Sequence, residues 1–298
     1  MPETPVIFDR QILRARRRRA AGLGAATFLV DRVADDLGER LAAVLRRFDV
    51  AADLGTPTPA LRRLLAAKVG RLIAVDALAG ELAAEPNLKV AADVEALPIC
   101  DGALDLAVSA MALQFVNDLP GALVQIRRAL KPDGLFLAAL LGGDTLIELR
   151  QAFAAAETEC EAGLSPRVAP FADLRELGAL LQRAGFALPV TDVDRVTVRY
   201  ATAFDLMHDL RRMGATNALS ERRRTPLRRT TLLRMVEIYM ERFADPDGRV
   251  RATFDVVWLS GWAPHESQPK PLAAGSAQVR LADALGVEEK SAGDKAVR

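Results

Sequence analysis

Among the acidic side chains in the first third of the chain, three stand at or just after the end of a short apolar run. They are Asp53, Asp76 and Asp93. Because the carboxyl ends of parallel strands meet at one edge of a sheet, these carboxylates are expected to converge there. Asp76 comes 21 residues after Gly55, and a carboxylate near this spacing accepts both ribose hydroxyls of a bound cofactor. The pattern predicts a nucleoside cleft, although Asp76 as a helix N-cap and Asp93 as an ordinary loop residue remain open alternatives.

The loop that follows the first apolar run reads Asp-Leu-Gly-Thr-Pro-Thr-Pro over residues 53–59. An S-adenosylmethionine (SAM) methyltransferase normally has three alternating glycines here, and only Gly55 remains. Thr58 is expected to cap the next helix and Pro59 to be its first residue. Pro57 and Pro59 lack amide protons and add bulk where the cofactor approaches. Nicotinamide binding is disfavoured because pyrophosphate recognition needs a glycine loop at a helix terminus, whereas SAM carries no phosphate.

The predicted SAM contacts come from four loops, the last of which, 109–123, follows the central strand and passes beneath the methyl-donor end. Asp93 and Val94 are expected to hold the adenine, and Asp76 the ribose. The order of the four loops is more specific than any one of them. The predicted cofactor-binding residues are Asp53, Gly55, Thr56, Asp76, Ala77, Asp93, Val94, Ser109 and Met111.

Further candidates lie near the expected reacting end, each with a structural alternative. Asp144 also suits a helix N-cap, and the glycines before it leave room for a ligand or for backbone. His208 equally suits a surface or core position, and Trp262 a packing role. The candidate catalytic residues are Gln114, Asp144 and His208, and the candidate substrate contacts are Phe115, Gly143, Trp262 and His265.

Composition excludes several classes of function. The 40 Lys and Arg balance 39 Asp and Glu, so net charge gives no reason to expect nucleic acid. Two cysteines and two histidines make a metal site improbable. No apolar run approaches the length of a membrane span, which favours the cytoplasm. The arginine-rich runs at 14–19 and 222–229 lack interleaved aromatic residues, which favours a solvated helix face or flexible arm over RNA binding.

Short apolar runs alternate with helical stretches, which predicts an α/β fold with a doubly wound, mostly parallel, seven-stranded Rossmann-like sheet. Two N-terminal helices occupy a segment at 1–48, the methyltransferase-fold domain spans 49–265 with a helical insertion at 201–250, and 266–298 form a tail that frays. The expected strands are 49–55, 71–77, 87–93, 103–111, 134–142, 188–200 and 251–262, and the expected helices between them include 59–68, 78–84, 120–130, 144–159 and 171–184.

Several segments resemble one methyltransferase group, which contains malonyl-acyl-carrier-protein O-methyltransferases and the arginine hydroxylases of complex I assembly. The resemblance to the second is closer and covers nearly the whole chain. It implies SAM as cofactor and modification of an arginine on a complex I iron–sulfur subunit, with peripheral attachment at the inner membrane during assembly. The segments are 104–134, GGDTLIELR at 142–150, SPRVAPF at 165–171, 204–219 and HESQPKP at 265–271.

Three hypotheses follow. The first is an enzyme in which SAM lies over the acidic loops and the 200–250 and 142–170 segments present a protein arginine. Methyl transfer then requires alignment more than a strong base, whereas hydroxylation requires an oxidant from elsewhere. The second is a non-catalytic assembly chaperone, favoured by Pro57, Pro59 and by Gln114-Phe115, where relatives commonly have His-Trp. The third is O-methylation of an acyl-carrier or small-molecule carboxylate.

Overall fold

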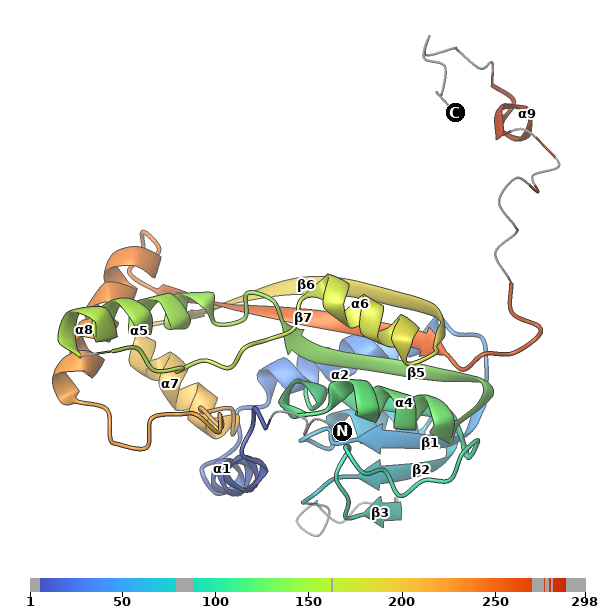
Figure 1. Ribbon diagram of the computed structural model, residues 1–298, viewed down its shortest axis with the longest axis horizontal. Helices are drawn as coiled ribbons and strands as arrows, with labels where there is room; N and C mark the ends of the chain where they lie inside the picture. Colours follow the sequence, from blue (N-terminus) through green and yellow to red (C-terminus); the bar gives the residue numbers. More distant parts are fainter. Residues whose placement is uncertain are drawn as a thin grey trace. The chain divides into compact units, whose positions relative to one another are not determined.

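A seven-stranded sheet with the order β3-β2-β1-β4-β5-β7-β6 organises the first of two compact units, residues 1–264. The computed structural model describes residues 6–78, 88–161, 163–269, 276, 279 and 281–287. The strands from β1 to β5 pair in parallel, and β7 is antiparallel to both β5 and β6, which confirms the predicted fold class (Figure 1). The strands are β1 (Phe48–Leu54), β2 (Val69–Val75), β3 (Leu88–Val90), β4 (Leu104–Ala110), β5 (Leu130–Gly142), β6 (Ala187–Tyr200) and β7 (Val250–Trp262).

Helices cover both faces of the sheet, as its near-continuous apolar strands require. One core contains the buried faces of α4 (Leu119–Ala129) and α6 (Leu174–Arg183). The other contains those of α2 (Phe28–Ala42) and α3 (Ala60–Ala66). That second core continues past the carboxyl edge of the sheet into three further helices, which Figure 1 shows beside the ends of the strands. These are α5 (Ile147–Cys160), α7 (Ala203–Arg212) and α8 (Arg229–Phe243).

The two arginine-rich stretches lie outside the sheet. The first forms α1 (Arg10–Gly22), which precedes α2 and contacts α7. The second lies largely in the connection between α7 and α8, where Arg223 and Arg228 pair with Glu161 at 3.2 and 3.7 Å. The helix expected at 78–84 falls almost entirely outside the described residues. No helix in the described part of the chain is both long and apolar enough to span a membrane.

Two predicted helix caps are wrong. Helix α3 begins at Ala60 after Pro59, and the Thr58 side chain makes no capping bond. Helix α5 begins at Ile147, and its N-cap is Leu146 in a left-handed conformation, with no side-chain cap. A turn at residues 142–145 separates Asp144 from the helix start, and Arg195 of β6 pairs with the Asp144 carboxylate at 2.7 Å. Asp144 therefore forms an exposed ion pair with Arg195 and does not cap α5.

The paired glycines at the end of β5 make room for protein groups. A Cβ atom on Gly142 would lie 2.5 Å from Val257 Cγ2, and one on Gly143 would lie 2.8 Å from Asp255 Oδ2. Asp255 Oδ2 accepts a hydrogen bond from the Asp144 backbone N–H at 3.0 Å, and Asp255 Oδ1 accepts one from Arg195 Nε at 2.7 Å. The space beside the two glycines is therefore occupied by the Val257 side chain, the Ala172 carbonyl and the Asp255 carboxylate.

We expect Gly143→Ala to destabilise the protein more than Gly248→Ala does. Both glycines have positive φ, 50° and 81° respectively, but a Cβ atom on Gly248 meets nothing within 4 Å. A left-handed alanine costs about 1–2 kcal/mol, and displacing the Asp255 carboxylate from its partners adds about 1–3 kcal/mol. Urea unfolding of both variants measures the difference, and equal losses would show that Asp255 does not constrain Gly143.

The C-terminal unit, residues 265–298, is described separately. Within it the His265 ring lies 2.7 Å from Ser267 Oγ, and a short helix, α9 (Leu281–Leu285), follows.

Candidate functional site

A buried ion pair between Asp53 and Arg62 anchors the loop after β1. Asp53 is 1% exposed, and its Oδ2 accepts a hydrogen bond from Arg62 Nη1 at 2.8 Å. Its Oδ1 accepts one from the Thr56 hydroxyl, whose oxygen accepts the Ala110 N–H at 3.0 Å. Burial raises the pKa of Asp53 to about 6, although Arg62 beside it acts to lower it. Asp53 and Thr56 therefore anchor the loop, and neither lines the cavities described below.

Gly55 adopts a conformation that other residues rarely tolerate. Its φ is +79°, and a Cβ atom there would lie 3.1 Å from the Ala112 Cβ. The single retained glycine thus allows the loop to approach the chain that follows β4. Ser109, also predicted as a cofactor contact, is instead buried below this loop and donates to the Leu54 carbonyl at 2.7 Å.

A small cavity lies at the carboxyl ends of β1, β2 and β4, and we call it the acidic cavity. Its volume is about 70 Å³. Asp76 and Asp93 both line it, so the structure brings together the two carboxylates that the spacing predicted to converge. Asp76 Oδ1 also accepts the Leu78 N–H at 2.6 Å, as in a turn or cap. The other predicted contacts that line the cavity are Gly55, Ala77, Val94 and Met111, and the residues not predicted for it include Arg10, Leu13, Arg17, Pro57 and Phe115.

Arg10 and Arg17 of α1 line this cavity, and Arg14 lies on the same helix; we call these three residues the arginine latch. Arg10 and Arg14 pair with Asp93 at 2.6 and 3.2 Å, and Arg17 pairs with Asp76 at 2.7 Å. Their spacing of four and three residues places them on one helix face. The expectation of a solvated face or flexible arm is therefore wrong for Arg17, which pairs with a buried carboxylate, whereas the Arg14 side chain is 42% exposed.

The ion pairs keep the rim charged. Burial acts to raise the pKa of Asp93, but hydrogen bonds from Arg10 and from the Glu95 N–H outweigh it and lower the pKa. The start of α1 is fixed as well, because the Phe8 N–H donates to Asn117 Oδ1 at 2.7 Å and Arg10 Nη1 donates to the Phe115 carbonyl at 2.7 Å. Helix α1 thus ties the loop after β3 to the loop after β4.

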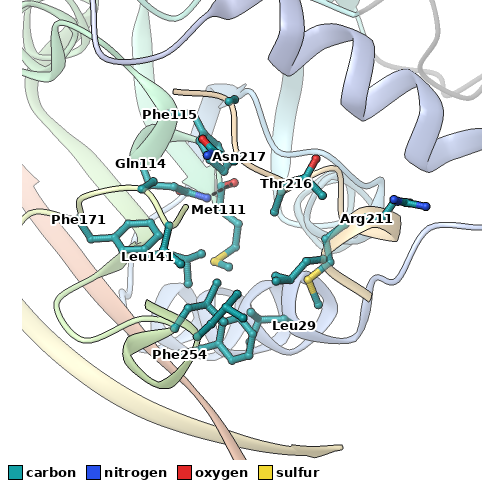
Figure 2. Close-up of a pocket in the computed structure, with 18 of the residues that line it drawn as sticks. Leu29, Met111, Gln114, Phe115, Leu141, Phe171, Arg211, Thr216, Asn217 and Phe254 are labelled. Atoms are coloured by element: carbon teal, nitrogen blue, oxygen red, sulfur yellow. Dashed lines mark hydrogen bonds between the residues drawn. The ribbon is translucent and has the colours of Figure 1, made fainter. Parts of the chain in front are cut away.

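A larger cavity of about 290 Å³ adjoins the first, and we call it the apolar cavity. Its lining residues come from α2, α5, the 167–171 segment, α7 and β7, among other segments, and Figure 2 shows Leu29, Leu141 and Phe254 around the space. Pro57, Met111, Phe115 and Met213 line both cavities. The remaining apolar lining includes Phe8, Leu29, Leu141, Leu149, Phe153, Phe171, Met207, Leu210 and Phe254.

Gln114 is a buried polar side chain in this lining (Figure 2). It lies in the short helix η2 (Leu113–Phe115) after β4 and is 9% exposed. Its Nε2 donates to the Met111 carbonyl at 2.8 Å. Its Oε1 has no hydrogen-bond donor among the described residues. Phe115 beside it packs edge-on against Phe8 with ring centroids 5.7 Å apart.

Charge in the apolar cavity comes from two arginines. Arg167 Nε donates to the buried Glu157 carboxylate at 2.7 Å, and its guanidinium lies 5.7 Å from the centre of the Phe153 ring. Arg211 of α7 is exposed. No carboxylate belongs to the described lining. The cavity therefore suits a ligand that is largely apolar and carries few polar groups.

Some predicted site residues lie elsewhere. His208 is exposed on α7 and does not line either cavity. Asp144 is 59% exposed in its pair with Arg195, and Gly143 lies beside Asp255. No cluster of metal-binding side chains occurs in the described portion.

Trp262 lies at the wrong edge of the sheet for the role predicted. Strand β7 is antiparallel to β5, and Trp262 pairs with Leu135, near the beginning of β5. The carboxyl ends of the parallel strands, where the cavities lie, are at the opposite edge. The same strand reaches the apolar cavity through Phe254 near its other end. His265 belongs to the separate C-terminal unit.

Comparison with known proteins agrees with this geometry. A family model described as a methyltransferase domain matches residues 52–138. The mitochondrial arginine-hydroxylase NDUFAF5 of Homo sapiens is 40% identical over 291 residues, covering 95% of this chain and 84% of that protein. The malonyl-[acyl-carrier protein] O-methyltransferase of Gallionella capsiferriformans is 32% identical over 275 residues, covering 87% and 92%.

Solved structures support the same assignment at the level of the fold. The YcgJ protein of Bacillus subtilis superposes with a TM-score of 0.53 at 16% identity, covering 77% of this chain and 98% of that one. A candidate methyltransferase of Bacillus halodurans C-125 gives a TM-score of 0.53 at 15% identity, covering 78% and 100%. The sheet, the acidic strand ends and the extent of the sequence identity lead to one conclusion: this chain belongs to the class I methyltransferase family, close to arginine-hydroxylase NDUFAF5.

Proposed function

We propose that the protein is a SAM-binding enzyme that modifies an arginine side chain of a protein, and that the substrate is an iron–sulfur subunit of respiratory complex I during assembly. The observation that carries the proposal is the pair of adjoining cavities. One has two carboxylates at its rim, the other is apolar, and they share Pro57, Met111, Phe115 and Met213. The names of the relatives that match over most of the chain support arginine as the group modified.

The polar and apolar side chains around the small cavity match the hydrogen-bonding groups and the base of the SAM nucleoside. Asp76 can accept both ribose hydroxyls, Asp93 can accept the adenine amino group, and Val94 offers an apolar surface for the base. The cavity between these residues is about 70 Å³, far below the roughly 300–1,000 Å³ of ordinary ligand sites. The arginine latch occupies part of the space that the nucleoside would need. Binding therefore requires Arg17 to leave Asp76, and Arg10 and Arg14 to release or share Asp93. When bound, SAM supplies an electrophilic methyl group.

The chain's own contribution is positioning. Gly55 lets the loop after β1 come close to the loop after β4, and the residues shared by the two cavities lie between cofactor and substrate. The phenylalanines around the apolar cavity exclude water from the reacting groups. Alignment of this kind promotes methyl transfer, in which a nitrogen–carbon bond would form as the sulfur–carbon bond breaks, and the proton lost by the guanidinium nitrogen would pass to solvent. Hydroxylation would in addition require an oxidant supplied by another protein or small molecule.

A second candidate is O-methylation of an acyl-chain carboxylate. Arg211 in the described lining, the lack of a lining carboxylate and the 32% identity to a malonyl-[acyl-carrier protein] O-methyltransferase favour it. The two candidates differ in what must enter the apolar cavity. Arginine modification places hydrogen-bond donors there, and O-methylation places an anionic acceptor.

Two measurements test the proposal. Calorimetric titration of the full chain with SAM should give binding heat, and absence of both heat and thermal shift at millimolar SAM would eliminate a SAM-dependent enzyme. Deleting the gene and weighing peptides of the complex I iron–sulfur subunit should show an arginine peptide lighter by one methylene or by one oxygen. An unchanged peptide mass with intact respiratory NADH oxidation would contradict the assembly role.

A further inference from the structure

The Gln114 side chain has an orientation that its surroundings fix. A carbonyl oxygen can only accept a hydrogen bond, so the group 2.8 Å from the Met111 carbonyl must be the amide nitrogen. The amide oxygen therefore points the other way. It is buried, and no described residue donates to it. Because buried acceptors are nearly always paired, this oxygen needs a donor from water or from a ligand.

A second carboxamide in the same lining shows the contrast. Asn217 Nδ2 donates to the Pro166 carbonyl at 2.6 Å, and Asn217 Oδ1 accepts the Leu219 N–H at 3.1 Å. Both of its polar atoms are engaged in holding the chain. Of these two carboxamides, only that of Gln114 has an acceptor with no donor among the described residues; this oxygen is buried, and the cavity wall to which the residue belongs is otherwise mainly apolar.

The place of this acceptor is also specific. Gln114 lies between Met111 and Phe115 in sequence, and those two residues line both cavities. The acceptor is therefore close to the junction where cofactor and substrate are expected to meet. The wall already holds one guanidinium against an aromatic ring, that of Arg167 over Phe153, and further phenylalanines offer the same kind of surface.

We propose that Gln114 is a specificity-determining residue whose Oε1 accepts an N–H of the substrate arginine's guanidinium. This inference rests on the proposed function and names what selects its substrate. A carboxylate ligand at the same place would bring two acceptors together, with no proton between them, and would be repelled. Gln114 thus favours a donor-bearing substrate over an acyl carboxylate. The exposed Arg211 is screened by solvent, and Arg167 is neutralised by Glu157.

The test uses ethylguanidinium and propionate, which are similar in size and opposite in charge and hydrogen-bonding character. Both are titrated into the full chain and followed by NMR. Gln114→Met keeps the side-chain length and removes the acceptor, so we expect it to weaken ethylguanidinium binding by roughly tenfold. Gln114→Glu supplies a charged acceptor and should tighten that binding by a similar factor. Gln151→Met, at an exposed position on α5, should change neither ligand.

The outcomes separate this inference from the proposed function. If Gln114→Met leaves ethylguanidinium affinity unchanged, or if propionate binds the native chain more tightly than ethylguanidinium, the assignment of Gln114 is overturned even when SAM binds. If the guanidinium series behaves as expected but SAM gives no binding heat, the SAM-dependent enzyme is eliminated and the acceptor assignment stands. Thermal melting of each variant checks that the cavity is intact, and Gln114→Glu provides a gain that misfolding would not produce.

Discussion

Arg62→Met is expected to lower the free energy of unfolding by about 3–5 kcal/mol, one of the two largest effects that the structure predicts. Asp53 and Arg62 are each 1% exposed and 2.8 Å apart. Removing the cation leaves a buried carboxylate with no opposite charge next to it. The loop that carries Gly55 loses a second contact as well, because Arg62 Nη1 also donates to the Thr56 carbonyl at 3.0 Å.

The loss should depend on pH. Burial raises the pKa of Asp53 to about 6 in the native chain, so its folded form binds a proton more readily than its unfolded form. Stability from this group is fully present below the unfolded pKa of about 3.9 and declines as pH rises to about 6. Without Arg62 the folded pKa rises further, so the variant should continue to lose about 1.4 kcal/mol per pH unit above pH 6, where the native chain levels off.

Urea unfolding at several pH values measures both effects. Arg63→Met is the matched control, because Arg63 is the next residue of α3 and is exposed. Combining Arg62→Met with Asp53→Asn should restore much of the stability, since no charge is then left buried. A loss that is the same at every pH, or that the double variant shares in full, would mean that packing rather than charge explains the effect.

The succession of strands and helices along the chain and the convergence of the acidic loops were accessible from sequence because both follow from local patterns. Apolar runs alternate with helical stretches, and a parallel sheet brings the ends of β2 and β3 to one edge. Asp76 and Asp93 could therefore be placed without knowing any contact. The resemblance of the segments at 142–150 and 165–171 identified the family, which the 40% identity to NDUFAF5 confirms.

Long-range partners were not accessible in this way. Arg17 is 59 residues from Asp76 in sequence, and only the spacing of Arg10, Arg14 and Arg17 on one helix face was a usable signal. The net charge of the chain did not reveal these ion pairs, because each latch arginine pairs with a carboxylate that is distant in the sequence. The apolar cavity had no polar motif at all. Trp262 was misplaced because the direction of β7 determines which edge its last residue reaches, and β7 runs against the other strands beside it.

Asp76→Asn is expected to weaken SAM binding by roughly a hundredfold, which corresponds to about 3 kcal/mol. The substitution keeps the size of the side chain and an acceptor for the Leu78 N–H, but it removes the charge that would strengthen the two hydrogen bonds we propose between Asp76 and the ribose. Asp101→Asn is the control, because Asp101 pairs with Arg128 on the surface and is 65% exposed. Calorimetry gives the dissociation constants.

The companion variant Arg17→Ala should have the opposite effect. If Asp76 binds the ribose as proposed, the ribose hydroxyls compete with Arg17, which lies 2.7 Å from a carboxylate that is 2% exposed. Removing the competitor while keeping the carboxylate should tighten SAM binding by roughly fivefold to tenfold, since the Arg17 side chain is 23% exposed and solvent screening leaves such a pair on the order of 1 kcal/mol. Weaker SAM binding in Arg17→Ala would show that the arginine latch holds the cofactor instead of excluding it. Tighter binding in Arg17→Ala together with weaker binding in Asp76→Asn is the result expected if α1 and the cofactor use the same carboxylate.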